Sequence, residues 1–322
     1  MAAGASGQTM RLINVAGLLV SLSLAPLLLA QSLAPRAYLI TPVGSNALTI
    51  SENYSSGDIE LNNTVPITGA NGSINVFVAT YYHGLSFCGR SANITLGLPY
   101  SVGTFRALVI DQQQEVYRSG LGDGAIRFAV NLKGGPAMKV PQFLKWKQKT
   151  LLGVSLLVQV PTGQYDPTKL INVGTNRWAF KPEFGYSQRW SKWILDAYGG
   201  VWFFTNNPEF FSHNQYVSGI QARSQLPIGV FEGHLSRDFK PRLWASIDAN
   251  FWFGGRTSIN GVPSANTLQR NSRVGATASV PISRHQSLKF SYANGAYARY
   301  GGDYQTISAA WQYAWVGKRF GD

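Results

Sequence analysis

The sequence offers few combinations of side chains that could perform catalysis. His234 and Ser236 lie two positions apart on one predicted strand, and His83 lies on another, so these residues are the candidates for a hydrolase. Such an enzyme needs its histidine within hydrogen-bonding reach of the serine. Side chains two apart on a strand are separated by roughly 6–7 Å at the backbone, which makes this contact awkward. Since the sequence also lacks a GxSxG motif, we do not expect an enzyme.

The spacings typical of metal and cofactor sites are also missing from the sequence. It contains one cysteine, Cys88, and four histidines, without an HExxH motif or a paired His–Cys spacing. We therefore predict no metal and no cofactor. A single cysteine also excludes a disulfide framework within the chain.

Charged side chains that alternate with apolar ones are the other chemical feature of the chain. If the apolar residues of each strand face lipid, the intervening residues line a lumen, where a charge is tolerated only beside water or a partner. An excess of cations there would favour anionic solutes, including aromatic carboxylates. The alternative is a structural network of ion pairs across the lumen, for which Lys181 and Glu183 are well spaced. The predicted pore-lining residues are Arg127, Lys133, Lys181, Glu183, Asp196, Arg242, Asp248, Arg273, Lys289 and Arg299.

One predicted loop carries polar residues that have two interpretations. Tyr165, Asp166, Asn176 and Arg177 lie in or beside the first distinct long loop on the outer side. Loops carry functional residues more often than scaffolds do, but Pro-Thr-Gly and Asp-Pro are also ordinary turn sequences. Pro182, inside a predicted strand, indicates a bulge or a local break in strand pairing.

The composition is unlike that of a soluble domain. The chain has 322 residues, of which 13% are charged, whereas soluble domains usually have about a quarter. Its 13% aromatic content argues against disorder. The net charge of +13 suggests anionic partners. Because the lysines and arginines are dispersed rather than gathered in one patch, we expect lipopolysaccharide or lumen solutes as these partners and no nucleic acid.

The N-terminus predicts export from the cytoplasm. Residues 12–30 form an apolar run after Arg11 and end at Ala30, the pattern of a cleaved secretory signal peptide. An uncleaved anchor is the alternative, which Pro26 and the missing basic stop-transfer cluster argue against. The predicted organisation is a signal peptide over 1–30, a periplasmic or lumenal N-terminal segment over 31–46, a barrel over 47–315 and a tail over 316–322.

The rest of the chain alternates apolar and polar residues with the period of a β-strand. From 242 to 253 the odd positions, such as Ile247, are all apolar, whereas the even positions include Ser246, Asp248 and Asn250. A soluble β-sandwich also alternates. Short and long connectors that alternate down the chain, however, are typical of a transmembrane β-barrel.

The alternation predicts an all-β fold, a transmembrane antiparallel up-and-down barrel of about twelve strands. The long connector 134–150 breaks the rhythm, and its FLKWKQK sequence indicates either a short amphipathic periplasmic helix or a solvated loop. The predicted strands are 47–54, 73–83, 91–100, 122–133, 151–160, 178–188, 194–204, 223–237, 242–253, 272–283, 287–298 and 304–315.

Aromatic residues gather toward the strand ends, as in the girdles that mark the two surfaces of a membrane. Ordinary core packing is the alternative explanation. The last predicted strand ends in WQYAW, similar to the closing strands that the barrel-assembly machinery reads, although seven residues follow Trp315. These features predict a location in the bacterial outer membrane.

Four motifs resemble those of the bacterial family named for the meta-pathway of phenol degradation. They are PTGQYD from Pro161, TNRWAFKPEFG from Thr175, SRVGAT from Ser272 and, less sharply, GRSANITLGLPY from Gly89. The resemblance covers most of the chain after the signal peptide. It implies an outer-membrane barrel, often encoded with aromatic-compound catabolism and proposed to pass hydrophobic substrates, and it implies no catalytic residues.

We therefore expect an outer-membrane channel that passes small hydrophobic or aromatic solutes by passive diffusion. A non-conducting barrel with a structural or surface role is the main alternative, and an outer-membrane hydrolase is a distant third. Residues 31–50 folded back into the lumen would favour the non-conducting alternative.

Overall fold

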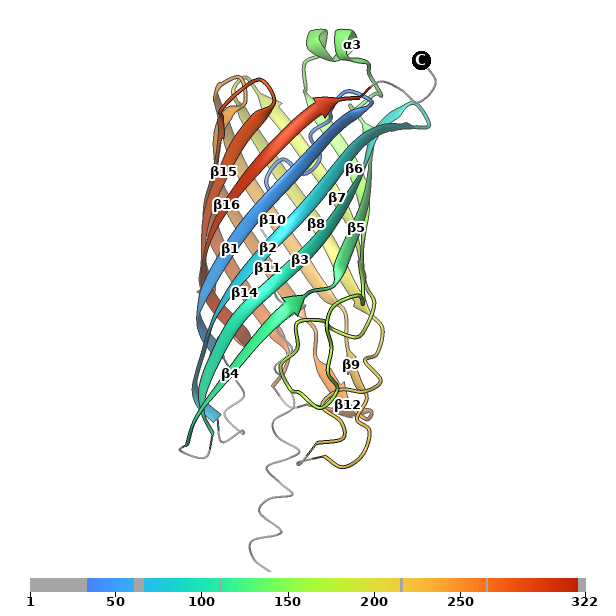
Figure 1. The fold of residues 1–322 in the computed structure, drawn as a ribbon. Helices are drawn as coiled ribbons and strands as arrows, with labels where there is room; N and C mark the ends of the chain where they lie inside the picture. The colour runs from blue at the N-terminus through green and yellow to red at the C-terminus, as the bar shows by residue number, and fades with distance from the viewer. Residues whose placement is uncertain (1–33, 61–66, 110–111, 215–216, 265, 318–322) are drawn as a thin grey trace, which may run out of the picture.

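The computed structural model describes residues 34–60, 67–109, 112–214, 217–264 and 266–317. The predicted signal peptide, 1–30, and the last five residues of the predicted tail lie outside the described residues. The described residues form a tall, closed barrel with strands that tilt around its axis (Figure 1).

The ring consists of twelve antiparallel strands, which confirms the predicted fold class. Ser45 pairs with Val316 and Glu60 with Gly301, so the first and last strands close the barrel. Closure leaves the ring without an edge, which a sheet in lipid requires. The strands of the ring are β1 (Ser45–Glu60), β2 (Ile67–Phe87), β3 (Arg90–Val109), β5 (Gly124–Lys133), β6 (Thr150–Val160), β7 (Ala179–Trp190), β8 (Trp193–Phe204), β10 (Ile228–Lys240), β11 (Leu243–Gly254), β14 (Gln269–Pro281), β15 (Gln286–Tyr297) and β16 (Gly301–Val316).

A further strand, β4 (Gln112–Leu121), was not predicted. It pairs with the far half of β3, from Tyr100 to Val109, and β5 continues along the same edge from Gly97. No described strand pairs with the other edge of β4. The segment 161–178 lies there instead, where the Gln164 amide donates to Leu121 O at 2.8 Å. The wall of the extended barrel is therefore completed by a loop at this point.

The predicted strand 223–237 is divided in the structure. It forms β9 (Arg223–Gln225) and, after a break that contains Pro227, β10. Proline has no amide hydrogen to donate to a neighbouring strand, which explains the break. β9 joins β12 (Thr257–Ile259) and β13 (Val262–Pro263) in a small sheet within the long loops.

Period-two alternation places successive side chains of the ring on opposite faces. On β11, Ile247 is 64% exposed on the outside, whereas its neighbour Asp248 is 4% exposed on the inside. Ile307 and Ser308 on β16 show the same division. The outer face is therefore an apolar band, and the inner face carries most of the polar side chains.

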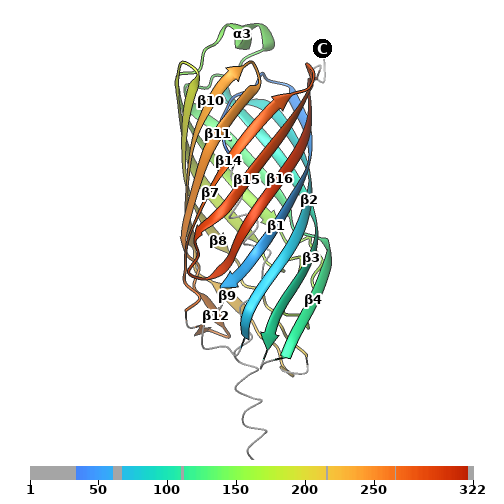
Figure 2. The same ribbon diagram turned by 90° about the vertical axis from the view of Figure 1, so that its left-hand side faces the viewer.

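Short and long connectors leave the barrel at opposite ends, as predicted. The turns 88–89, 191–192, 241–242 and 282–285 share one end, the short-turn rim, with the described C-terminal end and the 134–149 connector (Figures 1 and 2). We call the opposite end the long-loop rim. The connector 134–149 contains α3 (Val140–Lys145), so the helix interpretation is confirmed. Among the described residues, no helix is long and apolar enough to cross a membrane.

The division between the two faces of β16 predicts that an added charge destabilises the barrel on the outer face and not on the inner face. Ile307→Lys places an ammonium on the apolar band and should destabilise the folded barrel by roughly 2–4 kcal/mol near the midplane. Ser308→Lys is the matched control, because its side chain enters the lumen. We expect a lower urea midpoint for Ile307→Lys alone, measured in lipid vesicles. Equal midpoints for the two variants would contradict the assignment of the faces.

Candidate functional site

The lumen is the candidate functional site, and the residues that precede β1 occupy part of it. Arg36 reaches the inner face of the wall, where its Nη1 lies 2.8 Å from Asp238 and its Nε donates to Ser236 Oγ at 2.9 Å. The Arg36 amide donates to Asp196 at 3.2 Å. The guanidinium also stacks over the Trp244 ring at 4.3 Å. These contacts hold the N-terminal segment against β8, β10 and β11.

Tyr38 lies deeper in the lumen and is 1% exposed. Its hydroxyl donates to Glu183 Oε1 at 3.0 Å, and it lies 3.0 Å from Ser155 Oγ. The inward positions beneath its ring are Gly153 and Gly185, where a Cβ would collide with the ring. The wall therefore provides a recess for this tyrosine by omitting two side chains.

Ion pairs connect several of the predicted pore-lining residues. Lys181 Nζ lies 2.7 Å from Glu183 Oε2 and 3.7 Å from Glu232 Oε1. Arg127 Nη2 lies 3.7 Å from Glu183 Oε1. The pairing of Lys181 with Glu183, expected from their spacing, is confirmed. Both cations are thus engaged in the structural network that was the alternative to a selectivity role.

His234 belongs to the same layer of the lumen. Its Nδ1 lies 2.8 Å from Asp248 Oδ1, and its Nε2 lies 3.6 Å from Glu232 Oε2. Thr277 donates to the second oxygen of Asp248 at 2.7 Å. Ser236, another hydrolase candidate, accepts a hydrogen bond from Arg36. The histidine and the serine therefore have separate partners in the described structure.

An apolar layer covers the inner face of β7, β8, β10 and β11 next to the long-loop rim. Two indole rings, those of Trp202 and Trp252, are each 2% exposed there and form the layer with the smaller residues Ala179, Ile228 and Val230. Trp252 Nε1 donates to Gln269 Oε1 at 3.0 Å, so this indole is both packed and hydrogen-bonded. A solute that entered from the long-loop rim on the β7–β11 side would therefore meet this apolar layer before the ion pairs around Glu183 and Asp248.

The wall formed by β15, β16 and β1 is more open. Lys289 points inward from β15 but remains exposed, and Gln312 on β16 is also inward and exposed. Gln312 Nε2 donates to Thr49 Oγ1 across the seam between β16 and β1. Lys289 forms no ion pair within the part of the chain that the structure describes. It is therefore a cation facing accessible space inside the barrel.

Towards the long-loop rim this strip narrows. Arg273 is 5% exposed, and its guanidinium lies near Tyr304 O, at 3.4 Å, and Thr306 Oγ1, at 3.5 Å. Tyr304 itself is 3% exposed. Arg273 is thus placed at the narrow end of the strip and Lys289 in its open part.

Three predicted pore-lining residues lie at the rims, which corrects their assignment. Lys133 is exposed at the end of β5, beside a register shift. Arg242 lies in a short turn with φ of 64°, and its Nη1 donates to Ser283 O and Arg284 O at 2.7 Å. Arg299 is exposed between β15 and β16. Alternation could not place these residues, because it ceases where a strand ends.

The predicted loop residues lie together in the long loop between β6 and β7. Asp166 accepts hydrogen bonds from Thr168 and lies 2.9 Å from Lys169 Nζ; these contacts lower the pKa of its carboxyl to about 2. Tyr165 donates to Glu209 O at 2.9 Å. Ordinary turn chemistry therefore accounts for Asp166, as one interpretation predicted.

Asn176 and Arg177 connect that loop to its neighbours. Asn176 Nδ2 donates to Asn207 Oδ1 at 3.1 Å, and Arg177 Nη2 donates to Gln225 Oε1 at 2.5 Å. Arg177 is 4% exposed. Burial and the nearby positive charge of Arg223 lower the pKa of Arg177 to about 9.

Sequence reasoning did not single out Arg36 or Tyr38. Both precede the first strand, where alternation gives no information about contacts. Glu232 was also missed, although it lies two positions before His234 on the inward face of β10. This two-residue spacing is the signal in the sequence that could have identified Glu232 as a neighbour of His234 on the lumen wall. In the described residues, no group of three or more His, Cys, Asp or Glu side chains could hold a metal ion.

The closed ring, its apolar outer face and its charged lumen together define an outer-membrane type of β-barrel. The sequence matches the family described as "Putative MetA-pathway of phenol degradation" over residues 55–311, and the chain belongs to that family. No curated protein matches the sequence.

Solved structures share the fold. The COG4313 outer membrane channel from Pseudomonas putida F1 superposes with a TM-score of 0.73 and 17% identity, covering 88% of this chain and 100% of that chain. The transport unit of the autotransporter AIDA-I from Escherichia coli gives a TM-score of 0.50 and 12% identity, covering 92% and 95% of the two chains. At these identities the likeness shows the architecture alone.

The recess around Tyr38 predicts how the lumen responds when the tyrosine is removed. Tyr38→Ala should raise single-channel conductance by about twofold, because the ring obstructs the lumen and alanine leaves its recess open. Tyr54→Ala removes an outward-facing ring and serves as the control. Equal conductance in Tyr38→Ala and the unaltered protein would show that this residue does not limit passage.

Proposed function

We propose that this protein is an outer-membrane channel that passes small hydrophobic or aromatic solutes by passive diffusion. The observation that carries the proposal is the accessible strip along β15, β16 and β1, which contains the inward, exposed Lys289. A barrel filled only for stability would have no reason to leave an inward cation without an ion pair among the described residues. The family description, which refers to phenol degradation, supports aromatic compounds as the solutes.

The likeness to a COG4313 outer membrane channel supports conduction as the role of this architecture. We infer that the short-turn rim faces the periplasm and the long-loop rim faces the outside, as in bacterial barrels of this type. Cleavage of the signal peptide, contact of the basic surface with lipopolysaccharide, and recognition of β16 by the barrel-assembly machinery belong to the same proposal. The outward aromatic residues Trp311, Tyr313 and Trp315 on β16 support the last of these.

Selectivity follows from the charges that remain available to a solute. The carboxylate of Glu183 engages Lys181 and Arg127. Lys289 is therefore the cation that a solute in the open strip would meet, and Arg273 follows where the strip narrows. Fixed positive charge in a pore favours anions, so we infer a preference for anionic over cationic solutes.

A structural or surface barrel without conduction is the second candidate. The observation that favours it is the occupation of the lumen by Arg36 and Tyr38, together with the ion pairs around Glu183. Single-channel recording of the refolded protein distinguishes the two candidates. Discrete conductance steps support a channel, whereas a correctly folded but silent barrel supports the structural role.

The charge of Lys289 provides a test of selectivity. Lys289→Glu should shift the reversal potential in a salt gradient from anion towards cation preference, because it replaces the available positive charge with a negative one. Lys133→Glu makes the same change in charge at the short-turn rim and should shift the potential much less. A selectivity that is identical in Lys289→Glu and the unaltered protein would remove Lys289 from the solute path.

The solute class needs a separate measurement. Proteoliposomes that contain the barrel should release trapped benzoate and benzenesulfonate, aromatic anions that cross lipid slowly, faster than protein-free vesicles. Release of trapped glucose should be much slower than release of either aromatic solute. Release rates that match protein-free vesicles for both aromatic compounds, despite measured ion conductance, would contradict the aromatic solute class.

A further inference from the structure

The short-turn rim carries positive charge without acids to compensate it. Within the described residues, the connectors at this rim contain no aspartate or glutamate. Their exposed cations include Lys139, Lys145, Lys147, Lys149, Lys192 and Arg284. Basic clusters at a membrane surface attract the phosphate groups of anionic lipids.

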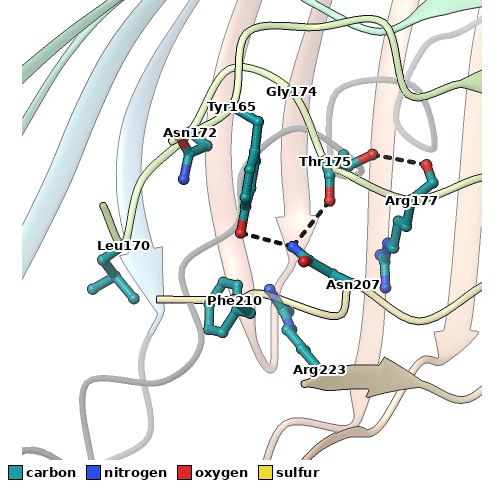
Figure 3. A pocket seen from close by; sticks show the side chains of 9 residues that line it. All are labelled: Tyr165, Leu170, Asn172, Gly174, Thr175, Arg177, Asn207, Phe210 and Arg223. Atoms are coloured by element: carbon teal, nitrogen blue, oxygen red, sulfur yellow. Dashed lines mark hydrogen bonds between the residues drawn. The ribbon is translucent and has the colours of Figure 1, made fainter. Parts of the chain in front are cut away.

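The long-loop rim carries a mixed charge instead. Its described loops contain Asp166 and Glu209 as well as cations such as Arg256. Polar contacts also hold these loops against one another. Asn207 Nδ2, for example, donates to the Tyr165 hydroxyl at 2.8 Å (Figure 3). The excess of positive charge in the described connectors is therefore a property of the short-turn rim.

Arg237 extends this charge onto the outer face of the wall. It is exposed on β10 and alternates with the inward residues Ser236 and Asp238. Its Cζ lies 5.2 Å from the centre of the Trp193 ring and 5.7 Å from the centre of the Phe239 ring. Its side chain has no ion pair or hydrogen bond within the described parts of the chain. The two rings thus position a guanidinium whose donors remain available to a ligand outside the barrel.

Two lysines lie at the turns that flank Arg237. Lys192 belongs to the turn between β7 and β8, Lys240 ends β10, and both are exposed. The Asp238 amide donates to Lys192 O at 2.8 Å, which joins the two turns. The Asp238 carboxylate points into the lumen, where it lies 2.8 Å from Arg36 Nη1. The nearest acid along the chain is therefore turned away from the outward cations.

An open apolar groove lies further along the same wall. Its volume is about 510 Å³, far more than the roughly 30 Å³ that one water occupies. The outward side chains of Phe184, Val201 and Phe231 line it, and Gly199 leaves room between them. A groove of this character on the lipid-facing side suits a hydrocarbon chain.

The break in strand pairing predicted at Pro182 is confirmed at this groove. The register of β7 and β8 passes from Phe180–Phe203 to Glu183–Gly200, so Pro182 has no partner on β8. Proline has no amide hydrogen to donate across the gap. Because Pro182 also lines the groove, the groove depends on the backbone of the wall as well as on its side chains.

The spacing between the cations and the groove matches one leaflet of a membrane. Arg237 lies six positions after Phe231 on β10, which is about 20 Å along a strand. Since barrel strands tilt by about 35–45°, this length corresponds to a depth of about 15 Å. Half of a hydrocarbon core of about 30 Å has the same thickness. A lipid with its headgroup at Arg237 would therefore bring the end of an acyl chain to the groove.

We propose that the outer face of β8 and β10 binds an anionic glycerophospholipid of the periplasmic leaflet. Arg237, Lys192 and Lys240 receive its phosphate, and one acyl chain lies in the groove beside Phe231. A guanidinium binds phosphate through charge-assisted hydrogen bonds. Phosphatidylglycerol has the required net negative charge, whereas phosphatidylcholine would bring a positive group to the same cations. The inference goes beyond conduction and rests on the proposed function only for the orientation of the barrel.

Native mass spectrometry of the refolded full-length barrel tests the headgroup site. The protein in detergent micelles receives equal amounts of phosphatidylglycerol and phosphatidylcholine with identical acyl chains. We expect preferential retention of phosphatidylglycerol, and Arg237→Gln should lower the ratio of the two bound lipids by about fivefold or more. Arg270→Gln is the matched control, because it removes an outward arginine beside Phe253 at the long-loop end of β14, and it should leave the ratio unchanged.

A second variant tests the groove. Gly199→Leu places a side chain in it, and a Cβ at this position lies at an ordinary contact distance of 3.5 Å from the Phe231 ring. We expect weaker retention of long-chain phosphatidylglycerol and unchanged retention of the dihexanoyl form, whose chains are too short to reach the groove. Equal retention of the long-chain lipid in Gly199→Leu and the unaltered protein would overturn the placement of the acyl chain.

Other outcomes would overturn the site as a whole. Equal retention of phosphatidylglycerol and phosphatidylcholine would do so, as would an unchanged ratio in Arg237→Gln. Preference for lipid A over phosphatidylglycerol would show that the ligand belongs to the opposite leaflet. Dimers that disappear in Gly199→Leu would assign the groove to a second copy of the chain. Heat-dependent gel mobility verifies that each variant is folded.

Conductance keeps the lipid site and the channel distinct. Arg237→Gln should retain the ion conductance of the unaltered protein, because Arg237 lies outside the lumen. Conductance without a preference for phosphatidylglycerol would refute the lipid site and leave the channel. Preferential binding of phosphatidylglycerol by a silent barrel would support the lipid site and refute conduction.

Discussion

The pairing of β1 with β16 is the constraint on which the rest of the structure depends. Hydrocarbon offers no hydrogen-bond partner to the backbone, so a sheet in a membrane must close on itself. The register from Ser45–Val316 to Glu60–Gly301 joins the two ends of the chain along the full length of both strands. Once the ring is closed, alternate side chains must face the outside or the lumen, and every later property of the site follows from that division.

Closure creates a lumen that the protein only partly fills. On the β7–β11 side, Glu183 joins Lys181 and Arg127, and His234 lies against Asp248. Buried charges are costly unless they are paired, which explains why these groups occur as a network. The β15–β16–β1 side does not show this paired arrangement in the described residues, since Lys289 there faces accessible space. The asymmetry between a packed side and an open side distinguishes a conduction path from a core.

Much of the fold could be predicted because lipid imposes a strict pattern on a strand that crosses it. β11 alternates without exception at its odd positions, and its predicted limits differ from the observed ones by one residue at each end. β4 was missed for the opposite reason. Nearly all of its residues are at least partly exposed. Neither face of β4 therefore has to be apolar, and its sequence does not alternate apolar and polar residues. A strand that extends beyond the apolar band need not alternate apolar and polar residues, so the sequence gives no period-two pattern by which to predict it.

The sequence by itself determined the class of fold, the face of the wall on which charges such as Lys181, Glu183 and Asp248 lie, and the family, because all three depend on local order along the chain. Only the tertiary structure decided which charges pair and which remain available. Arg36 meets Asp238 across 202 positions of sequence, and Arg177 meets Arg223 through the folding of separate loops. Such contacts depend on barrel curvature and strand stagger, which the spacing of residues along one strand does not encode.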